Sequence, residues 1–257
     1  MKIAVIADIH GNLPALDAVL TDMAHRDVQL VVNLGDSLSG FLFPRETADR
    51  LMTLDMPAIR GNHERQLLAS EQDRMGPADA FTASALTPEH RAWMAALPET
   101  RRVLDDVLLV HGTPRSDMEY FLHTVTPDGL HEATDDEILE RARSADEVDA
   151  TSAAVILCGH THLPRVFRLD DGRLVVNPGS VGLQAYEYDH PYPHRVENGS
   201  PHARYAILEQ RDRRWSAELV TVSYDWERSV AAATANGRPD WAGVLRTGQL
   251  PANRLRS

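Results

Sequence analysis

The sequence predicts a single α/β domain that spans all 257 residues. Two observations predict this class. Over the first 60 residues, short apolar runs alternate with amphipathic segments, which is the pattern of strands that alternate with helices. Strand signals return after residue 150, and no linker-like or repeated stretch separates them from the first set. We therefore expect one body, with helical insertions at about 64–98 and 114–150 that could cap a site.

The first 60 residues predict a strand–helix–strand–helix–strand order. Strands are expected at 2–8, 28–34 and 57–60, and helices at about 13–26 and 44–55. Asn12 is typical of a helix N-cap, and Pro14 suits the first turn that follows it. This alternation predicts a parallel sheet with right-handed crossovers, covered on both faces.

The rest of the chain predicts two helical insertions and further strands. Residues 101–105 and 107–111, after the first insertion, form an expected hairpin. The second insertion is acidic, and Asp135-Asp136-Glu137 suits the beginning of a helix. Later strands are expected at 154–158, 165–169, 173–177, 204–209 and 215–222. The last 30 residues predict two short helices and a frayed end.

Composition and charge exclude several classes of protein. The net charge is −12, from 26 Lys and Arg against 38 Asp and Glu, which argues against non-specific binding of nucleic acid. No run approaches the roughly 18 apolar residues of a membrane span, and the N-terminus lacks a signal-peptide pattern. One cysteine, Cys158, excludes an internal disulfide framework. We expect a cytoplasmic protein with no membrane partner, and its oligomeric state stays open.

Five short polar segments each come directly after a predicted strand. They are Asp8-Ile9-His10, Gly35-Asp36, Gly61-Asn62-His63-Glu64, His111-Gly112 and Gly159-His160-Thr161-His162. Taken singly, each is ordinary turn and capping chemistry, although chance expects only roughly 0.02 Gly-Asn-His and 0.03 Gly-His-x-His in this composition. Because sites form at the carboxyl ends of parallel strands, the five segments have a geometric reason to converge.

The residue types in these segments suit divalent cations. Imidazoles and carboxylates without a thiolate favour ions such as Mn²⁺, Fe²⁺ or Zn²⁺. Seven candidate ligands are more than one such ion takes, whereas two ions that share one carboxylate would each have four. Two ions about 3.5–4 Å apart can hold a hydroxide and clamp a phosphoryl group for in-line displacement. Cations would also let an acidic protein handle an anionic substrate.

Together the five segments resemble the calcineurin-like metallophosphoesterase superfamily, over residues 2 to about 182. Asp8-Ile9-His10-Gly11-Asn12 and the turn Asn177-Pro178-Gly179-Ser180 are most similar to its short bacterial and archaeal phosphodiesterase branch. The resemblance implies a four-layer αββα sandwich with two mixed β-sheets, the metallo-dependent phosphatase fold. It also implies that His63 stands outside the metal shell as the catalytic acid.

The resemblance further implies a ligand set. One metal ion would be held by Asp8, His10 and His162. The other would be held by Asn62, His111 and His160, and Asp36 would bridge both. We expect two divalent ions per chain and favour Mn²⁺, with Fe, Zn, Ni or Co as alternatives.

One motif departs from the protein Ser/Thr phosphatases of this superfamily. Those enzymes have Gly-Asp-x-x-Asp-Arg-Gly, whereas this chain has Ser39 in place of the second Asp and Gly40 in place of the Arg. The Asp that would orient the catalytic histidine and the Arg that would grip phosphate are therefore absent. This departure argues against a protein phosphatase.

The predicted function is a dinuclear-metal phosphoesterase acting on phosphodiesters or small phosphorylated metabolites. A non-catalytic metal-binding interaction module on the same fold is the alternative, and a protein Ser/Thr phosphatase is a weaker one. The segment 186–194 is rich in Tyr and His. It could border the site and stack a nucleobase, or be an exposed loop or a self-association surface. Substrate-binding residues are not predicted.

Overall fold

Two mixed β-sheets pack face to face in the computed structural model, which describes residues 1–148 and 153–252. The first sheet has the order β13-β12-β1-β2, and only β1 and β2 in it run parallel. Its strands are β1 (Lys2–Ile6), β2 (Leu30–Asn33), β12 (Ala203–Arg211) and β13 (Arg214–Val222). The second sheet has the order β3-β4-β7-β9-β8. Its strands are β3 (Arg101–Val103), β4 (Val107–Leu109), β7 (Val155–Leu157), β8 (Arg165–Arg168) and β9 (Leu174–Asn177).

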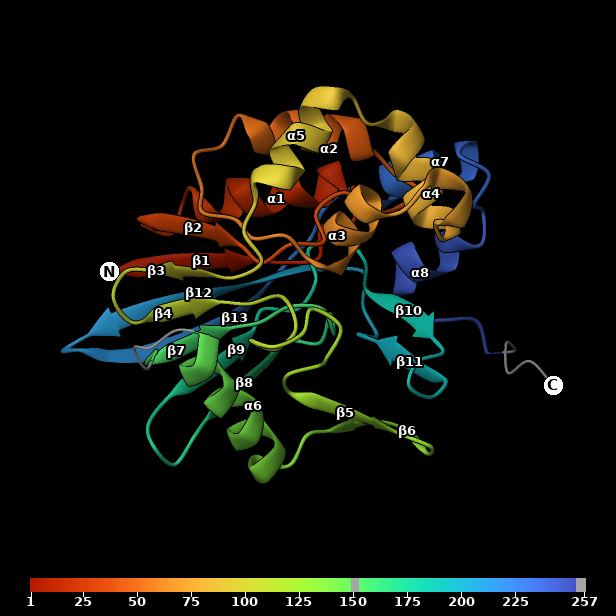
Figure 1. The fold of residues 1–257 in the computed structure, drawn as a ribbon. Coiled ribbons are helices and arrows are strands. Elements are labelled where there is room, and N and C mark those ends of the chain that lie inside the picture. The colour runs from red at the N-terminus through yellow and green to blue at the C-terminus, as the bar shows by residue number, and fades with distance from the viewer. Residues whose placement is uncertain (149–152, 253–257) are drawn as a thin grey trace.

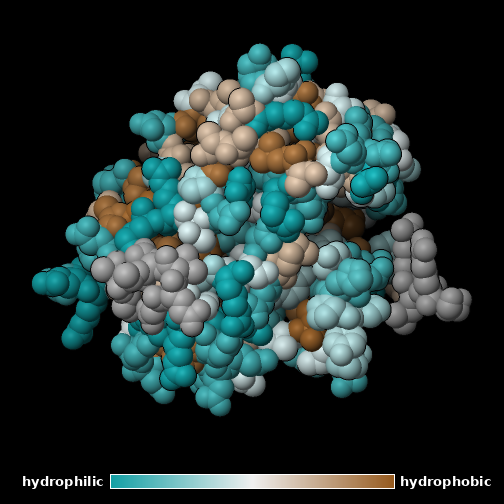
Figure 2. Space-filling view, in the orientation of Figure 1, coloured by the Kyte–Doolittle hydropathy of each residue, from teal (hydrophilic) through white to brown (hydrophobic). Residues whose placement is uncertain are grey.

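Helices lie on the outer faces of both sheets, and α1 and α6 are on opposite sides of the molecule (Figure 1). Their bounds are α1 (Leu13–Met23), α2 (Pro44–Met52), α3 (Asn62–Ala69), α4 (Pro77–Ala85), α5 (Pro88–Ala96), α6 (Asp135–Val148), α7 (Trp226–Ala235) and α8 (Trp241–Thr247), with a 3₁₀ turn η1 (Gln72–Arg74). None of the helices in the described ranges is both long and apolar enough to cross a bilayer. Hydrophilic residues cover most of the visible face (Figure 2).

The alternation of side chains along β1 links two cores. Ile3 and Val5 belong to the core between the sheets, whereas Ala4 and Ile6 belong to the core that also contains Leu16 of α1. Successive side chains of a strand point to opposite faces, so this short strand must be apolar throughout.

The second sheet repeats this arrangement with the opposite helical layer. Leu109 and Leu157 pack in the core between the sheets. Leu108 and Ile156 instead share a core with Ile138 of α6. The layers are thus helix, sheet, sheet and helix, which confirms the expected αββα sandwich.

The N-terminal sheet differs from the local prediction in two respects. Its inner face meets the second sheet, so the expectation of helices on both faces is wrong. The predicted strand at 57–60 contributes only a parallel bridge between Ala58 and Asn33. The chain leaves the sheet there because the amide of Arg60 donates to the carbonyl of Pro98 instead.

The second predicted insertion is only partly helical. The first, 64–98, is helical as expected, in α3 to α5. Within 114–150, however, β5 (His123–Thr126) and β6 (Gly129–Glu132) form an antiparallel hairpin before α6 begins. Two β-branched residues flank Val125, and Pro127-Asp128 supplies the turn, which is a hairpin signal in a segment predicted to be a helix. The predicted helix end at 149–150 and the frayed end at 253–257 lie outside the described residues.

A second hairpin was not predicted at all. It consists of β10 (Ala185–Tyr188) and β11 (His194–Glu197), which pair antiparallel. These strands bound the Tyr- and His-rich segment 186–194. The segment thus runs from β10 through the turn at 189–193 to the first residue of β11.

The core between the sheets predicts a clear difference between two leucines. Leu109 on β4 is fully buried there, whereas Leu219 on β13 is 40% exposed. We expect Leu109→Ala to lower the free energy of unfolding by about 2–5 kcal/mol, because it removes buried carbons and leaves a cavity. Leu219→Ala should lower it by about 1 kcal/mol or less. Urea unfolding followed by circular dichroism measures both, and equal losses would contradict this packing.

Candidate metal centre

The polar segments that follow the strands meet at one edge of the two sheets. Asp8 and His10 come after β1, Asp36 after β2, His111 after β4, and His160 and His162 after β7. Asn62 and His63 begin α3. The seven candidate ligands are all buried. The fold thus gathers every predicted site residue in the region where strands of both sheets end.

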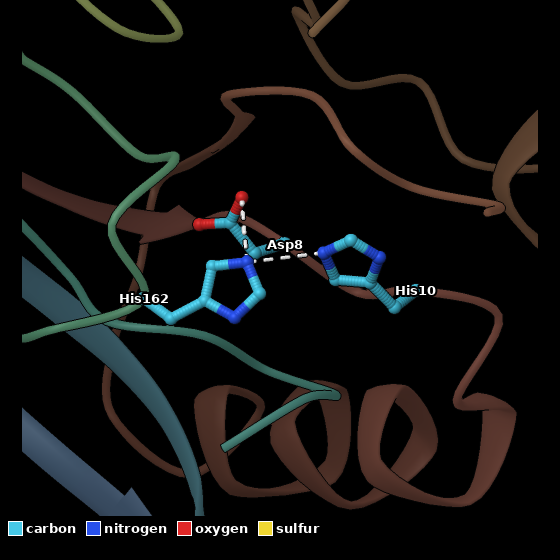
Figure 3. Close-up of side chains that lie close together, drawn as sticks. All are labelled: Asp8, His10 and His162. Atoms are coloured by element: carbon cyan, nitrogen blue, oxygen red, sulfur yellow. Dashed lines mark hydrogen bonds and ion pairs between the residues drawn. The ribbon is translucent and has the colours of Figure 1, made fainter. Parts of the chain in front are cut away.

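The first group consists of Asp8, His10 and His162, whose potential ligand atoms all lie within 4.8 Å of one another. The Nε2 atoms of the two histidines face each other at 3.1 Å (Figure 3). His162 Nε2 is also 3.6 Å from Oδ1 of Asp8. This is the grouping that the resemblance implies for one ion.

The second group consists of Asp36, His111 and His160, which meet the same 4.8 Å criterion. His111 Nε2 lies 3.1 Å from Oδ2 of Asp36 and 3.0 Å from Oδ1 of Asn62. Asn62 therefore stands beside this group, as the resemblance implies.

Backbone carbonyl groups fix the orientation of three of the four histidine rings. The Nδ1 atoms of His10 and His162 donate to the carbonyl oxygens of Ser39 and Leu183, each at 2.7 Å. His111 Nδ1 donates to the carbonyl oxygen of Leu34 at 2.8 Å. A carbonyl oxygen only accepts, so each Nδ1 carries a proton and each ring points its Nε2 into the site, where a neutral ring offers a lone pair.

These lone pairs are what a cation would bind. Burial lowers the pKa of His10 to about 4 and that of His160 to about 3, so both rings are neutral near pH 7. His10 and His162 then have no proton to share between their facing Nε2 atoms. His160 Nε2 is buried and has no hydrogen-bond partner among the residues that the structure describes. Both groups therefore fit divalent cations.

His111 differs because it stands beside carboxylates. Burial alone would lower its pKa, but the negative charge of Asp36 outweighs burial and raises it to about 10. A cation that binds the second group must therefore displace a proton from this ring.

The backbone at the site is unusual. Nine non-glycine residues have a positive φ within the described ranges, and five of these are candidate ligands: Asp8 (54°), His10 (50°), Asp36 (53°), His160 (68°) and His162 (59°). L-residues rarely adopt this left-handed region, and such strain clusters at functional sites. The loops after the strands thus turn sharply to point these side chains inward.

Glu64 holds two of the ligand loops together, and the sequence analysis gave it no role. Its buried carboxylate accepts hydrogen bonds from the amides of Asp36, Ser37 and Gly61, each at 2.8 Å. A Glu three residues after the N-cap Gly61 is the acceptor half of a capping box, and this spacing was the signal that could have identified it.

His63 lies at the rim of the site, with 28% of its side chain exposed. Its amide donates to Oδ1 of Asp36 at 2.9 Å, and its Nδ1 donates to Oδ1 of Asp79 at 2.8 Å. Burial lowers the pKa of His63, but the charge of Asp36 and the hydrogen bond to Asp79 outweigh it and raise the pKa to about 9.

The position of Asp79 corrects the sequence analysis. Ser39 does replace the Asp of the phosphatase motif, but the conclusion that no Asp orients His63 is wrong. Asp79 comes from the first turn of α4, and it accepts a hydrogen bond from the Ser39 hydroxyl as well. Nothing in the sequence near Asp79 distinguishes it from the other acidic residues of the insertion.

Gly40, in the place of the phosphatase Arg, reflects a close approach of two loops. A Cβ atom there would collide with the carbonyl oxygen of His10. No side chain fits at this position, so an Arg cannot occupy it without moving a ligand loop.

A cavity of about 270 Å³ opens above both ligand groups and is also lined by His63. Tyr120, Tyr186, Tyr188 and Trp241 contribute aromatic rings to its walls. The hydroxyl of Tyr186 donates to the carbonyl oxygen of His160 at 3.1 Å. The segment 186–194 therefore does border the site, through β10.

Comparisons with known proteins agree with this geometry. The family model for the calcineurin-like phosphoesterase superfamily domain matches residues 1–194. An uncharacterized protein of Methanocaldococcus jannaschii is 26% identical, over 94% of this chain and 95% of its own. Phosphodiesterase YfcE of Escherichia coli is 28% identical, over 71% of this chain and 86% of its own.

A solved structure resembles most of the chain. The crystal structure of a metallophosphoesterase from Sphaerobacter thermophilus superposes with a TM-score of 0.72 at 26% identity, covering 97% of this chain and 99% of that one. The family match covers well over half of the sequence. The chain thus belongs to the calcineurin-like phosphoesterase superfamily.

Proposed function

We propose that the chain is a dinuclear-metal phosphoesterase that hydrolyses phosphodiesters or small phosphorylated metabolites. The observation that carries this proposal is that two buried ligand groups line one cavity with His63 at its edge. Phosphodiesterase YfcE, which matches most of this chain, supports a diester as the substrate.

Each side chain has a distinct part in this proposal. The first group, Asp8, His10 and His162, would hold one ion. His111 and His160 would hold the other together with Asn62, and Asp36 would be shared by both. Two divalent ions supply an activated water and a clamp for phosphoryl oxygens. Imidazole nitrogens with carboxylate or amide oxygens and no thiolate suit divalent ions such as Mn²⁺, Fe²⁺ or Zn²⁺, and Mn²⁺ is the ion that we propose to test first.

His63 would deliver a proton to the leaving oxygen. It lines the cavity but is hydrogen-bonded to Asp79 through Nδ1, which leaves Nε2 for the substrate. A positioned acid contributes about 10²–10⁴-fold to the rate, because it neutralises charge that develops only in the transition state.

The site favours a small substrate over a phosphorylated protein. The cavity of about 270 Å³ has room for a phosphoryl group and a compact second moiety. No arginine can stand at Gly40 to grip phosphate in the manner of the protein phosphatases.

The first prediction concerns His63. With Mn²⁺ and an aryl phosphodiester, we expect His63→Ala to lower kcat by at least about 10²-fold, because the leaving oxygen loses its proton donor. His25→Ala changes an exposed histidine of the same chain and should leave kcat unchanged. Release of the phenol, followed by absorbance, measures both. A non-catalytic module would show no metal-dependent hydrolysis in any variant, and equal rates in wild type and His63→Ala would overturn the role of the acid.

The second prediction concerns the ions. We expect two Mn²⁺ per wild-type chain and one in His160→Ala, because His160 belongs to only one group. Plasma mass spectrometry of the dialysed protein measures this ratio, with His25→Ala as the control that keeps two.

Binding should also release protons at pH 7–8, because His111 must lose its proton to bind a cation. Calorimetry in buffers of different ionisation enthalpy detects this release. A wild type that binds no more than one ion in excess Mn²⁺ would contradict a dinuclear centre.

A further inference from the structure

We propose that the substrate carries an uncharged aromatic group, which lies in a second cavity beside the metal site and stacks against Trp241. This inference rests on the proposed function, because the aromatic group would be one ester moiety of the phosphodiester. It names a class of substrate and a residue that selects it, neither of which follows from the ligand groups.

A side cavity of about 370 Å³ adjoins the cavity above the ligand groups. The two cavities share five lining residues, which are Ala78, Leu183, Tyr186, Glu187 and Trp241. Because these residues line both spaces, a substrate whose phosphate lies at the ligand groups can extend past them into the side cavity. Binding sites for small molecules have volumes of about 300–1,000 Å³, and the two cavities together fall in this range.

Three elements that are distant in the sequence form the shared wall. Ala78 comes from α4, Tyr186 from β10 and Trp241 from the first turn of α8. These elements lie on the same side of the molecule (Figure 1), and α8 packs against β10 through a small apolar cluster. Trp241 lies beyond residues 1–194, which match the family model. The matched domain alone therefore does not contain this wall.

The aromatic rings of the wall are fixed before any ligand binds. Trp241 stands edge-on to Phe41, with the ring centroids 5.2 Å apart and the planes at 87°. The guanidinium of Arg238 lies 4.2 Å from the Phe41 centroid and 5.6 Å from that of Trp241. The hydroxyl of Tyr186 lies 2.8 Å from that of Tyr120. Rings that are already ordered lose little freedom when a planar group packs on them, so they suit stacking.

The charges around the side cavity favour an uncharged group. Among the described residues that line it, Arg238 is the one cation. Its Nε and Nη2 donate to Oδ1 and Oδ2 of Asp240 at 2.8 and 2.6 Å. Glu187 adds an exposed carboxylate. A second phosphate would meet two carboxylates and a guanidinium that is already paired, which is unfavourable. An aromatic ring covers the apolar wall without a counter-charge.

A purely structural role for Trp241 makes a different prediction. Its ring also packs in the apolar clusters around α8, so its loss would lower stability. Loss of packing alone would weaken every ligand alike or none. Loss of a stacking wall would weaken only ligands that carry a ring.

The test measures binding to the Mn²⁺-loaded protein by isothermal titration calorimetry. The probes are phosphonates, whose carbon–phosphorus bond a phosphoesterase does not cleave. We expect wild type to bind benzylphosphonate at least about 10-fold more tightly than methylphosphonate, because the ring is buried. In Trp241→Leu, which keeps an apolar side chain, this advantage should shrink by at least about 5-fold. The affinity for methylphosphonate should change by less than about 2-fold.

Trp226→Leu is the matched control. Trp226 is also half-buried but lines neither cavity, so this variant should keep the full advantage of benzylphosphonate. Equal affinities of wild type for the two phosphonates would overturn the inference. An unchanged advantage in Trp241→Leu, or an equal loss for both probes, would overturn it as well.

Two further probes define the aromatic group. We expect 4-carboxybenzylphosphonate to bind at least about 5-fold more weakly than benzylphosphonate, because its carboxylate would face Asp240 and Glu187. Tighter binding would contradict an uncharged occupant. A gain for thymidine 5′-phosphonate that depends on Trp241 would identify a nucleoside as the source of the ring. A gain for the benzyl compound alone would identify a simple aryl ester.

A second variant keeps the inference testable if Trp241→Leu does not fold. Ala78→Leu should narrow the passage between the two cavities from the side of α4. We expect it to weaken benzylphosphonate by at least about 5-fold and methylphosphonate by less than about 2-fold. Equal changes for both probes would overturn the inference.

The outcomes also separate this inference from the proposed function. If wild type hydrolyses no phosphodiester with added Mn²⁺ but shows binding that depends on the ring, the proposed function fails and the aromatic site stands. If aryl phosphodiesters are hydrolysed and the ring adds no affinity, only the aromatic site fails.

Discussion

The centre depends on hydrogen bonds from ring nitrogens to backbone carbonyl oxygens. Because Leu34, Ser39 and Leu183 accept from Nδ1 of three histidines, the opposite nitrogens face into a buried space. There the Nε2 atoms of His10 and His162 meet each other, and that of His111 meets Asp36. Within residues 1–148 and 153–252, the two facing Nε2 atoms of the first group have only each other at hydrogen-bond distance, an arrangement that suits a bound cation. Glu64 supports it by tying the Asp36 loop to the Gly61 loop.

The four layers explain why such a centre forms where it does. Strands β1 and β2 end beside β4 and β7, although they belong to different sheets. Loops from both sheets therefore reach one edge, and sharp left-handed turns aim their side chains inward. Apolar residues on the facing sides of the two sheets fix the distance between them. The position of the ligands is thus set by the core and not by the loops alone.

The sequence predicted most of the centre because its residues follow strands at short, rare spacings. Asp8-x-His10 alone is ordinary turn chemistry, and it became informative only as one of five ordered segments. Asp79 lies far from these segments and meets His63 only through tertiary packing. The sheet-on-sheet layer came from the resemblance, because a strand buried on both faces has the same apolar pattern under a helix or a sheet. The β5–β6 hairpin was missed because its short strand signal around Val125 lies within a longer acidic segment whose overall composition favours a helix.

The carboxylate beside His63 lies on an inserted helix rather than on the loops that follow the strands. The part of the molecule that would deliver protons is therefore built separately from the part that would bind cations. A shift of α4 by a single turn, about 5.4 Å, would break the contact between Asp79 and His63 while leaving every candidate ligand in place. Exchange of this one segment between related chains would thus change the rate of turnover without changing the cation ligands.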